Sequence, residues 1–229
     1  MAKGKGKIID DAAVSPVKFD HYKLEIELIE KLLGTCPKNP EVYKAYIMTK
    51  APSEDLYPEE AKDAEESFKE LEEKNWTGFM FDENGLFIYD YLIKGNLKEN
   101  ANTLKDMLGI AALRSKVEES VFVYPRRIYF GTKEPHGYIE RPLRAMTAQG
   151  PRVTVTRSDY INEGTTITCY LEVLHGYMPK KILTAILDFG SRKGLGQFRT
   201  GGYGRYVYKL NDISHEEFDD AVALLENVV

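Results

Sequence analysis

Glycine, arginine and aromatic residues are concentrated in one segment near the C-terminus, GLGQFRTGGYGR at residues 194–205. Glycine permits positive φ angles, and successive amide groups in such turns can form an anion-binding nest. Guanidinium groups bind phosphate through paired hydrogen bonds, and aromatic rings offer faces for base stacking. The segment therefore predicts phosphate and base contacts by Arg192, Lys193, Gly194, Gly196, Gln197, Phe198, Arg199, Gly202, Tyr203, Gly204 and Arg205.

The segment differs from a nucleotide P-loop, because no Gly-Lys-Ser/Thr ending follows and the glycines lead into a predicted strand instead of a helix. A mononucleotide cofactor is therefore disfavoured, and no cofactor is expected. The alternative is a glycine-rich hairpin that serves packing alone.

A second group of basic residues lies between Pro125 and Arg157, where arginine outnumbers lysine. The planar guanidinium suits phosphate and base contacts better than an ammonium group does. Its candidates for binding are Arg126, Arg127, Arg141, Arg144 and Arg152. Residues 141–144 and 149–152 are interpreted as loop edges flanking a strand, and some of these arginines are expected to pair with Glu140, Asp159 or Glu163.

The net charge of −5 is distributed unevenly along the chain. Residues 1–109 carry −7, residues 110–209 carry +8 and residues 210–229 carry −6. The local field of a protein steers an anionic partner more than its total charge does. Both basic groups lie in the positive stretch, which favours a polyanion partner unless the charges spread over different faces.

Catalysis has weaker support than binding. His136 and His21 are the candidates for a metal-independent ribonuclease, because such an enzyme needs a group that titrates near neutrality. No HExxH or GxSxG motif occurs, and Cys36 and Cys169 lack metal-ligand spacing. We therefore expect no metal site and two buried thiols, and we leave open whether the chain is an enzyme.

The apolar pattern predicts a mixture of strands and helices. Residues 22–28 alternate as a half-buried strand, predicted to close at Gly34-Thr35. The remaining predictions are a helix at 58–74, a strand at 86–89, a helix from Asn96 to Gly109, strands at 120–124, 152–157 and 165–174, a helix from Pro179 to a left-handed Gly190, a strand at 206–210 and a helix from Ser214 with a capping box to Glu217.

This order predicts an α+β domain in which helices pack on one face of an antiparallel sheet. We expect a flexible basic arm at 1–18, the main domain at 19–210 with an acidic helical insertion at about 37–76, and a terminal helix at 211–229 packed on the domain. The chain has no run of about 20 apolar residues and no secretory h-region at its start, so a cytoplasmic protein without membrane contact is expected.

Several segments together resemble the RAMP superfamily, the RNA-binding subunits of CRISPR effector complexes, and above all their backbone subunits. The resemblance rests on four features between about residues 20 and 210: Leu-Gly-Thr at 33–35, the Asp-x-x-Gly turn at 82–85, Ile-Lys-Gly-x-Leu-Lys at 93–98 and the late glycine-rich loop.

The resemblance implies a ferredoxin-like, RRM-related fold whose glycine-rich loop and a neighbouring helix contact RNA phosphates. Carried over to this chain, the helix-start contact is made by Lys94, Gly95 and Lys98. A helix N-terminus favours anions on physical grounds as well.

We therefore predict a protein that binds single-stranded RNA, with other subunits of a ribonucleoprotein, or further copies along the RNA, as possible partners. The alternatives are an endoribonuclease of the same fold and an interaction protein that joins or blocks a ribonucleoprotein through the acidic segments 54–73 and 212–226.

Overall fold

The computed structural model describes residues 17–38, 76–147 and 150–226, without the side chains of residues 143–147, 150–154 and 226. Its centre is a four-stranded antiparallel sheet of strand order β12-β1-β11-β7. The strands are β1 (Phe19–Leu28), β7 (Val121–Tyr124), β11 (Thr166–Leu174) and β12 (Tyr206–Ile213).

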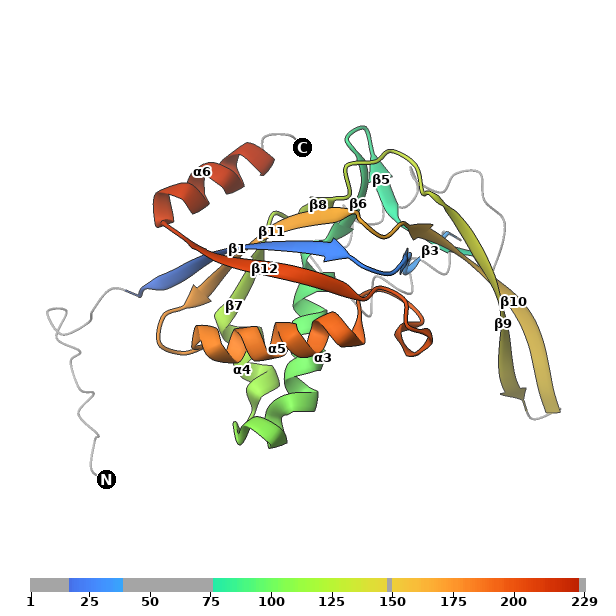
Figure 1. Cartoon of the computed structure of the whole chain (residues 1–229), viewed down its shortest axis with the longest axis horizontal. Helices are drawn as coiled ribbons and strands as arrows, with labels where there is room; N and C mark the ends of the chain where they lie inside the picture. Colours follow the sequence, from blue (N-terminus) through green and yellow to red (C-terminus); the bar gives the residue numbers. More distant parts are fainter. Residues whose placement is uncertain (1–16, 39–75, 148–149, 227–229) are drawn as a thin grey trace, which may run out of the picture.

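Two helices cover one face of this sheet, α3 (Asp90–Leu108) and α5 (Lys180–Lys193) (Figure 1). Along the chain the order is β1-α3-β7-β11-α5-β12, the β-α-β-β-α-β sequence of the ferredoxin-like fold. The predicted α+β class, with helices on one face of an antiparallel sheet, is confirmed.

The core lies between the sheet and the two helices. Alternate residues of the central strands are buried, including Leu24 and Ile26 of β1 and Leu171 of β11. They face Leu97 of α3 and Ile186 of α5, which are also buried. Each such side chain contributes about 1.5–3 kcal/mol by leaving water, so this layer holds both helices against the sheet.

Two smaller sheets are formed by the segments that connect the elements of the central layer. One has strand order β2-β10-β4-β3 with β9 paired to β10, and the other has order β5-β6-β8. Their strands are β2 (Leu32–Leu33), β3 (Cys36–Pro37), β4 (Trp76–Gly78), β5 (Met80–Asp82), β6 (Gly85–Tyr89), β8 (Arg127–Tyr129), β9 (Gly137–Thr147) and β10 (Gly150–Ile161). A short helix, α4 (Leu113–Ser120), follows α3.

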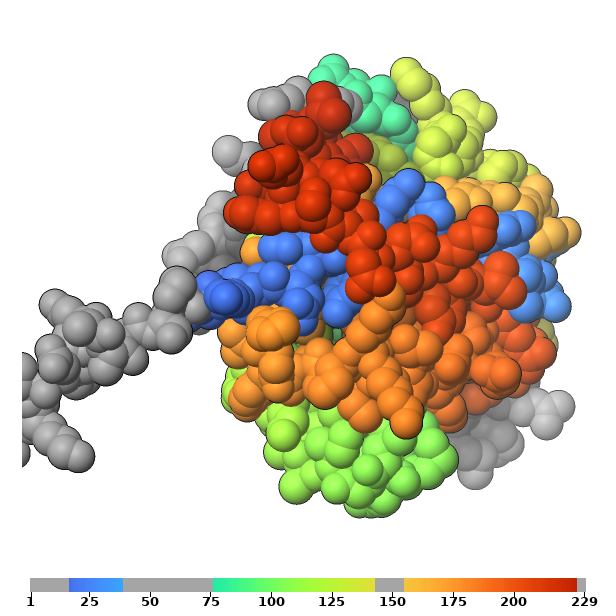
Figure 2. All heavy atoms as spheres, turned by 60° about the vertical axis from the view of Figure 1, so that its left-hand side comes forward, coloured from blue at the N-terminus to red at the C-terminus, as the bar shows by residue number. Residues whose placement is uncertain are grey.

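The terminal helix α6 (His215–Glu226) lies on the opposite face of the central sheet (Figures 1 and 2). The predicted capping box is present: the Ser214 amide donates to Glu217 at 2.8 Å, and the Glu217 amide donates to the Ser214 hydroxyl at 3.2 Å. Phe218 is buried against His21 of β1. Among the described side chains of α6, Phe218 is the buried one, and it is the main contact of this helix with the sheet.

The start of α3 differs from the prediction. The helix begins at Asp90, directly after β6, and not near Asn96. Ile93 is buried and extends the apolar stripe of Leu97 by one turn, so the helix was predicted too short. Lys94 and Lys98 consequently lie in the second and third turns, and the argument from the helix N-terminus does not apply to them.

The end of α5 also differs from the prediction, which placed it at Gly190. Gly190 lies inside α5, which continues to Lys193 and ends at Gly194 with a φ of 89°. A Cβ at Gly190 would lie 2.6 Å from both Asn100 Nδ2 and the Tyr206 hydroxyl. The glycine therefore lets α5 pack closely, and it does not end the helix.

Two strand predictions need correction. The first strand ends at Leu28 instead of continuing to Gly34-Thr35. Residues 141–144, predicted as a loop edge, form part of β9, and Pro151 and Arg152 belong to β10. Among the described strands, β9 pairs with β10 alone, so Pro142 sits in an edge strand, where a missing amide donor is tolerated. The helix predicted at 58–74 and the arm up to residue 16 lie outside the described residues.

Candidate nucleic-acid interface

A cleft of about 830 Å³ lies between α3, α4 and the loop that follows α5. Lys94, Gly95 and Lys98 of α3 line one side, and Gly196, Gln197 and Arg199 of the loop line another. The structure thus brings the helix motif and the glycine-rich loop together, although they are about 100 residues apart in sequence.

The cleft carries an excess of positive charge. Four cations line it, Lys94, Lys98, Arg114 and Arg199, together with two carboxylates, Glu99 and Glu118. Lys98 pairs with Glu118 at 2.5 Å, whereas Lys94 and Arg114 make no ion pair within the described part of the chain. These two cations are the ones available to a ligand without breaking an internal bond.

Lys94 is partly withdrawn from water. Its ammonium lies 5.0 Å from the centroid of the Phe122 ring. Burial, and then the neighbouring Lys98, lower the pKa of Lys94 below its ordinary value. A nearby phosphate would raise the pKa of Lys94 again, because an opposite charge favours the charged form of the ammonium group.

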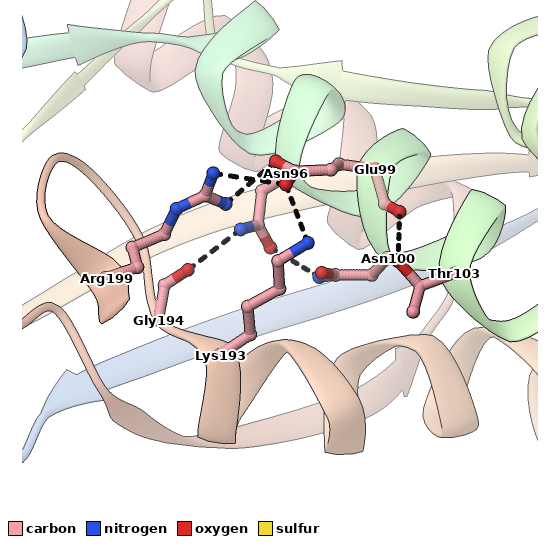
Figure 3. A network of polar contacts seen from close by, with 7 residues as sticks. All are labelled: Asn96, Glu99, Asn100, Thr103, Lys193, Gly194 and Arg199. Carbon is pink, nitrogen blue, oxygen red and sulfur yellow. Dashed lines mark hydrogen bonds and ion pairs between the residues drawn. The ribbon is translucent and has the colours of Figure 1, made fainter. Parts of the chain in front are cut away.

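A polar network joins the loop to α3 (Figure 3). Asn96 donates to the carbonyl of Gly194 at 3.0 Å and accepts from Asn100 at 2.8 Å. Glu99 accepts from Lys193 Nζ at 2.6 Å and from both terminal nitrogens of Arg199 at 2.8 and 3.1 Å. Two residues of α3 thereby fix where the loop begins and where its first arginine points.

Glu99 is ionised at neutral pH. Burial tends to raise the pKa of Glu99, but the hydrogen bonds from Arg199 and then Lys193 outweigh burial and hold the pKa below the ordinary carboxyl value. The carboxylate therefore carries a full negative charge beside two of the predicted binding cations.

The loop glycines largely serve packing. A Cβ at Gly204 would overlap the carbonyl oxygen of Leu195, and one at Gly196 would lie 2.6 Å from the carbonyl oxygen of Leu33. Six amides of the loop, those of residues 194, 195, 197, 201, 202 and 204, donate to backbone carbonyls. The glycine content therefore has a structural cause, and these amides are not available to an anion.

Gly95 is different. It is exposed inside α3, and a Cβ built there would meet nothing within 4 Å. Glycine in a helix interior costs about 1 kcal/mol relative to alanine. No contact within the described residues accounts for this cost, and the residue lines the cleft.

Aromatic residues stand beside the cleft at the tip of the loop. The Phe198 side chain is 46% exposed although its backbone has a φ of 51°, which is uncommon for a bulky residue. The Tyr203 ring lies 5.8 Å away, and the Arg141 guanidinium lies 4.7 Å from the Phe198 ring centroid. These three residues form one cluster, in which Phe198 is the exposed member.

Side chains of β4, β9 and β10 fix the position of Gln197, the residue before Phe198. Gln197 Oε1 accepts from Arg141 at 3.2 Å, from Ser158 at 3.2 Å and from Thr77 at 3.3 Å. Nε of Arg141 is buried and has no hydrogen-bond partner among the described residues. The β9–β10 ribbon projects beyond the rest of the molecule (Figure 1).

Four of the other predicted arginines, Arg126, Arg127, Arg192 and Arg205, do not line the cleft. Arg126 pairs with Asp90 at 2.6 Å and Arg127 with Asp82 at 2.9 Å, because β8 runs beside β6. Arg192 donates to the backbone of its own helix, and Arg205 is exposed after the loop. Among the expected acidic partners, Glu140 pairs with Arg157, and Asp159 pairs with Lys38. The side chains of Arg144 and Arg152 lie outside those described.

Neither candidate histidine joins the cleft. His21 is buried under α6, its Nε2 3.5 Å from Glu172 and its ring 5.0 Å from that of His215. His136 is exposed before β9, where its Nδ1 accepts from the Asn162 amide at 3.1 Å. In the described ranges, no three His, Cys, Asp or Glu residues are grouped to hold a metal ion.

Three residues of the site were missed in the sequence. No motif specifies Arg114, Glu99 or Asn96, since Asn96 is the variable position of the segment at 93–98. Asn96 and Glu99 become significant through partners distant in the chain, and Arg114 because the fold places it in the cleft. The only local signal was the pair Asn96 and Asn100, two polar side chains four residues apart on the apolar stripe of a predicted helix. Polar residues in such a position are usually there to make a specific hydrogen bond.

Comparisons with known proteins do not identify a family for this chain. Neither a protein-family model nor a curated protein matches the chain. A similar solved structure is a chain described as "Cryo-EM structure of the Type III-B Cmr-beta bound to cognate target RNA", with a TM-score of 0.44 and 14% identity over 86% of this chain. The match spans 61% of that chain. The ferredoxin-like assignment therefore rests on strand order and connectivity alone.

No helix in the described ranges is both long and apolar enough to cross a membrane.

Proposed function

We propose that this chain binds single-stranded RNA, with the RNA backbone in the cleft between α3 and the glycine-rich loop. Lys94 and Arg114 would contact phosphates directly, because neither is held in an ion pair within the described part of the chain. The two remaining cleft cations, Lys98 and Arg199, would bind phosphate by exchanging an internal carboxylate for it.

The open face of Gly95 is the observation that carries this proposal. An exposed glycine in the middle of α3 is unfavourable for the helix, and no neighbour in the described residues requires it. The absence of a side chain lets a ligand backbone approach the helix closely between Lys94 and Lys98. A bulky, repeating anion is the ligand that would use both the space and the charge.

The preference for a single strand follows from the aromatic tip. Phe198, Tyr203 and Arg141 offer π and guanidinium faces, and bases can stack on them only when they are unpaired. A duplex would bring its phosphates to the cleft but could not use this surface.

The proposal includes membership in a larger RNA-protein assembly of the RAMP kind. It is supported by the ferredoxin-like strand order and by the position of the two matched motifs on one cleft. In this role the chain would bind RNA without regard to sequence, since the named contacts are to phosphates and base faces.

The test is fluorescence anisotropy with single-stranded RNA over a range of salt concentrations. The double substitution Lys94→Ala with Arg114→Ala should weaken binding at low salt. The slope of log K against log [salt] should become shallower by about 0.7 for each lost phosphate contact.

The matched control is Lys181→Ala with Lys209→Ala. It removes the same charge from exposed positions that do not line the cleft. Absence of binding at low salt, or equal effects of the two double substitutions, would contradict the proposed function.

A further inference from the structure

The Glu99 carboxylate lies between two cations, Lys193 at the end of α5 and Arg199 in the loop that follows. The Arg199 guanidinium binds both carboxylate oxygens, at 2.8 and 3.1 Å, and Lys193 binds one of them at 2.6 Å (Figure 3). This paired geometry is the one in which guanidinium groups bind phosphate oxygens. Glu99 and Arg199 both line the cleft, so an entering RNA backbone meets these cations already bound to an anion.

The loop does not need Glu99 to stay in place. Asn96 donates to the Gly194 carbonyl in a buried hydrogen bond, and the Gly204 amide donates to the backbone carbonyl of Lys31 at 2.8 Å. Leu195 is buried in the core between them. Neither these hydrogen bonds of the loop backbone nor the burial of Leu195 involves the Glu99 carboxylate. The backbone of the loop is therefore held by contacts other than Glu99, whose carboxylate binds the side chains of Lys193 and Arg199.

The charges indicate what Glu99 does to a ligand. One phosphodiester carries one negative charge, as the carboxylate does, so the exchange puts one anion in place of another at these cations while Glu99 stays nearby in the chain. The exchange by itself adds little binding free energy, and the affinity rises only when the same strand also reaches Lys94 and Arg114 in the cleft. Short anions would then be rejected and longer strands accepted.

Resting on the proposed function, we propose that Glu99 is an internal competitor: its carboxylate occupies the phosphate position of Lys193 and Arg199, lowers the affinity for RNA and favours long strands over short ones. The residue acts on binding through Lys193 and Arg199 instead of contacting the RNA.

The decisive variant is Glu99→Gln, which keeps the size of the side chain and removes its charge. Single-stranded RNA should bind roughly three- to tenfold more tightly at low salt, as expected for one or two added phosphate contacts, and the salt slope should steepen by about 0.7–1.4. The preference for long over short oligonucleotides should also shrink.

Glu27→Gln is the matched control, because it makes the same change of charge in β1, exposed on the sheet face that α3 and α5 do not cover. Glu99→Ala is a second variant and should also tighten binding. Thermal unfolding of each variant establishes that it is folded. Weaker or unchanged RNA binding by both Glu99 variants would overturn the competitor role, because a carboxylate that only holds the loop gives that result.

Inorganic polyphosphate chains separate this inference from the proposed function. If the wild-type chain binds polyphosphate but not RNA, and Glu99→Gln binds polyphosphate more tightly, RNA binding is wrong and the competitor role stands. If RNA binds to the wild type and the Glu99 variants do not bind it more tightly, only the competitor role is wrong. If neither polyanion binds to any variant, both are wrong.

Discussion

At the scale of single residues, Gly95 should show opposite effects on stability and on binding. Gly95→Ala adds a methyl group in open space and removes the cost of glycine in a helix, so the free energy of unfolding should rise by about 0.5–1 kcal/mol. The same methyl group narrows the approach to α3, so the affinity for single-stranded RNA should fall. Urea unfolding and anisotropy titrations measure the two quantities.

Ser115→Ala in α4 is the matched control for this prediction. It also raises helix propensity at an exposed position, but Ser115 does not line the cleft. This variant should be slightly more stable than the wild type and bind RNA equally well. A Gly95→Ala protein that is more stable and binds RNA as tightly as the wild type would show that the open face of Gly95 has another cause.

At the scale of elements, α6 is held on the sheet mainly by its buried Phe218. Phe218 packs 4.6 Å from the ring of His21 and also contacts the rings of Tyr124 and Tyr170. Phe218→Ala should lower the free energy of unfolding by about 3 kcal/mol, the usual cost of deleting a buried phenyl ring. Because α6 lies on the sheet face opposite to α3, RNA affinity of the folded variant should be unchanged.

Leu224→Ala, in the same helix and 71% exposed, is the comparison for Phe218→Ala. Its effect on the free energy of unfolding should stay within about 0.5 kcal/mol, as is usual for surface positions. Equal losses from the two substitutions, measured by urea unfolding, would contradict the role of Phe218 as the main contact of α6 with the sheet.

Elements were predictable where the pattern is local. The alternation in β1 and β11 and the capping box of α6 were found in the sequence, because burial on one strand face and a cap three residues away need no distant partner. The start of α3 was missed because β6 enters it without a turn. Residues 141–144 of β9 are predicted as a loop edge because proline is disfavoured in strands unless they lie at the edge of a sheet.

At the scale of the whole molecule, both cysteines should report on global unfolding. Cys36 and Cys169 are 6% and 1% exposed, and burial raises the pKa of the Cys169 thiol to about 12. The thiolate is the reactive form, so neither thiol should react with a disulfide reagent in the native protein at pH 8. Labelling of Cys36→Ala and Cys169→Ala variants over a urea series should follow the unfolding curve. Rapid labelling of Cys169 without urea would contradict this.

The residues that could bind a polyanion were largely recognisable from their types: the arginines, the aromatic residues of the loop and the lysines of α3 all appear in the amino-acid sequence as unusual clusters. Which of these residues are free to bind a polyanion was not recognisable from the sequence. The pairing of Glu99 with Lys193 and Arg199, the presence of Arg114 in the cleft and the pairing of Arg126 and Arg127 with acidic residues all depend on the packing of distant segments. Sequence patterns encode the local periodicity of burial, whereas the neighbours of an ionised group are decided by which helix, strand and loop the core brings together. The tertiary structure therefore decided that the loop glycines pack, that Gly95 remains open, and which cations the cleft can offer.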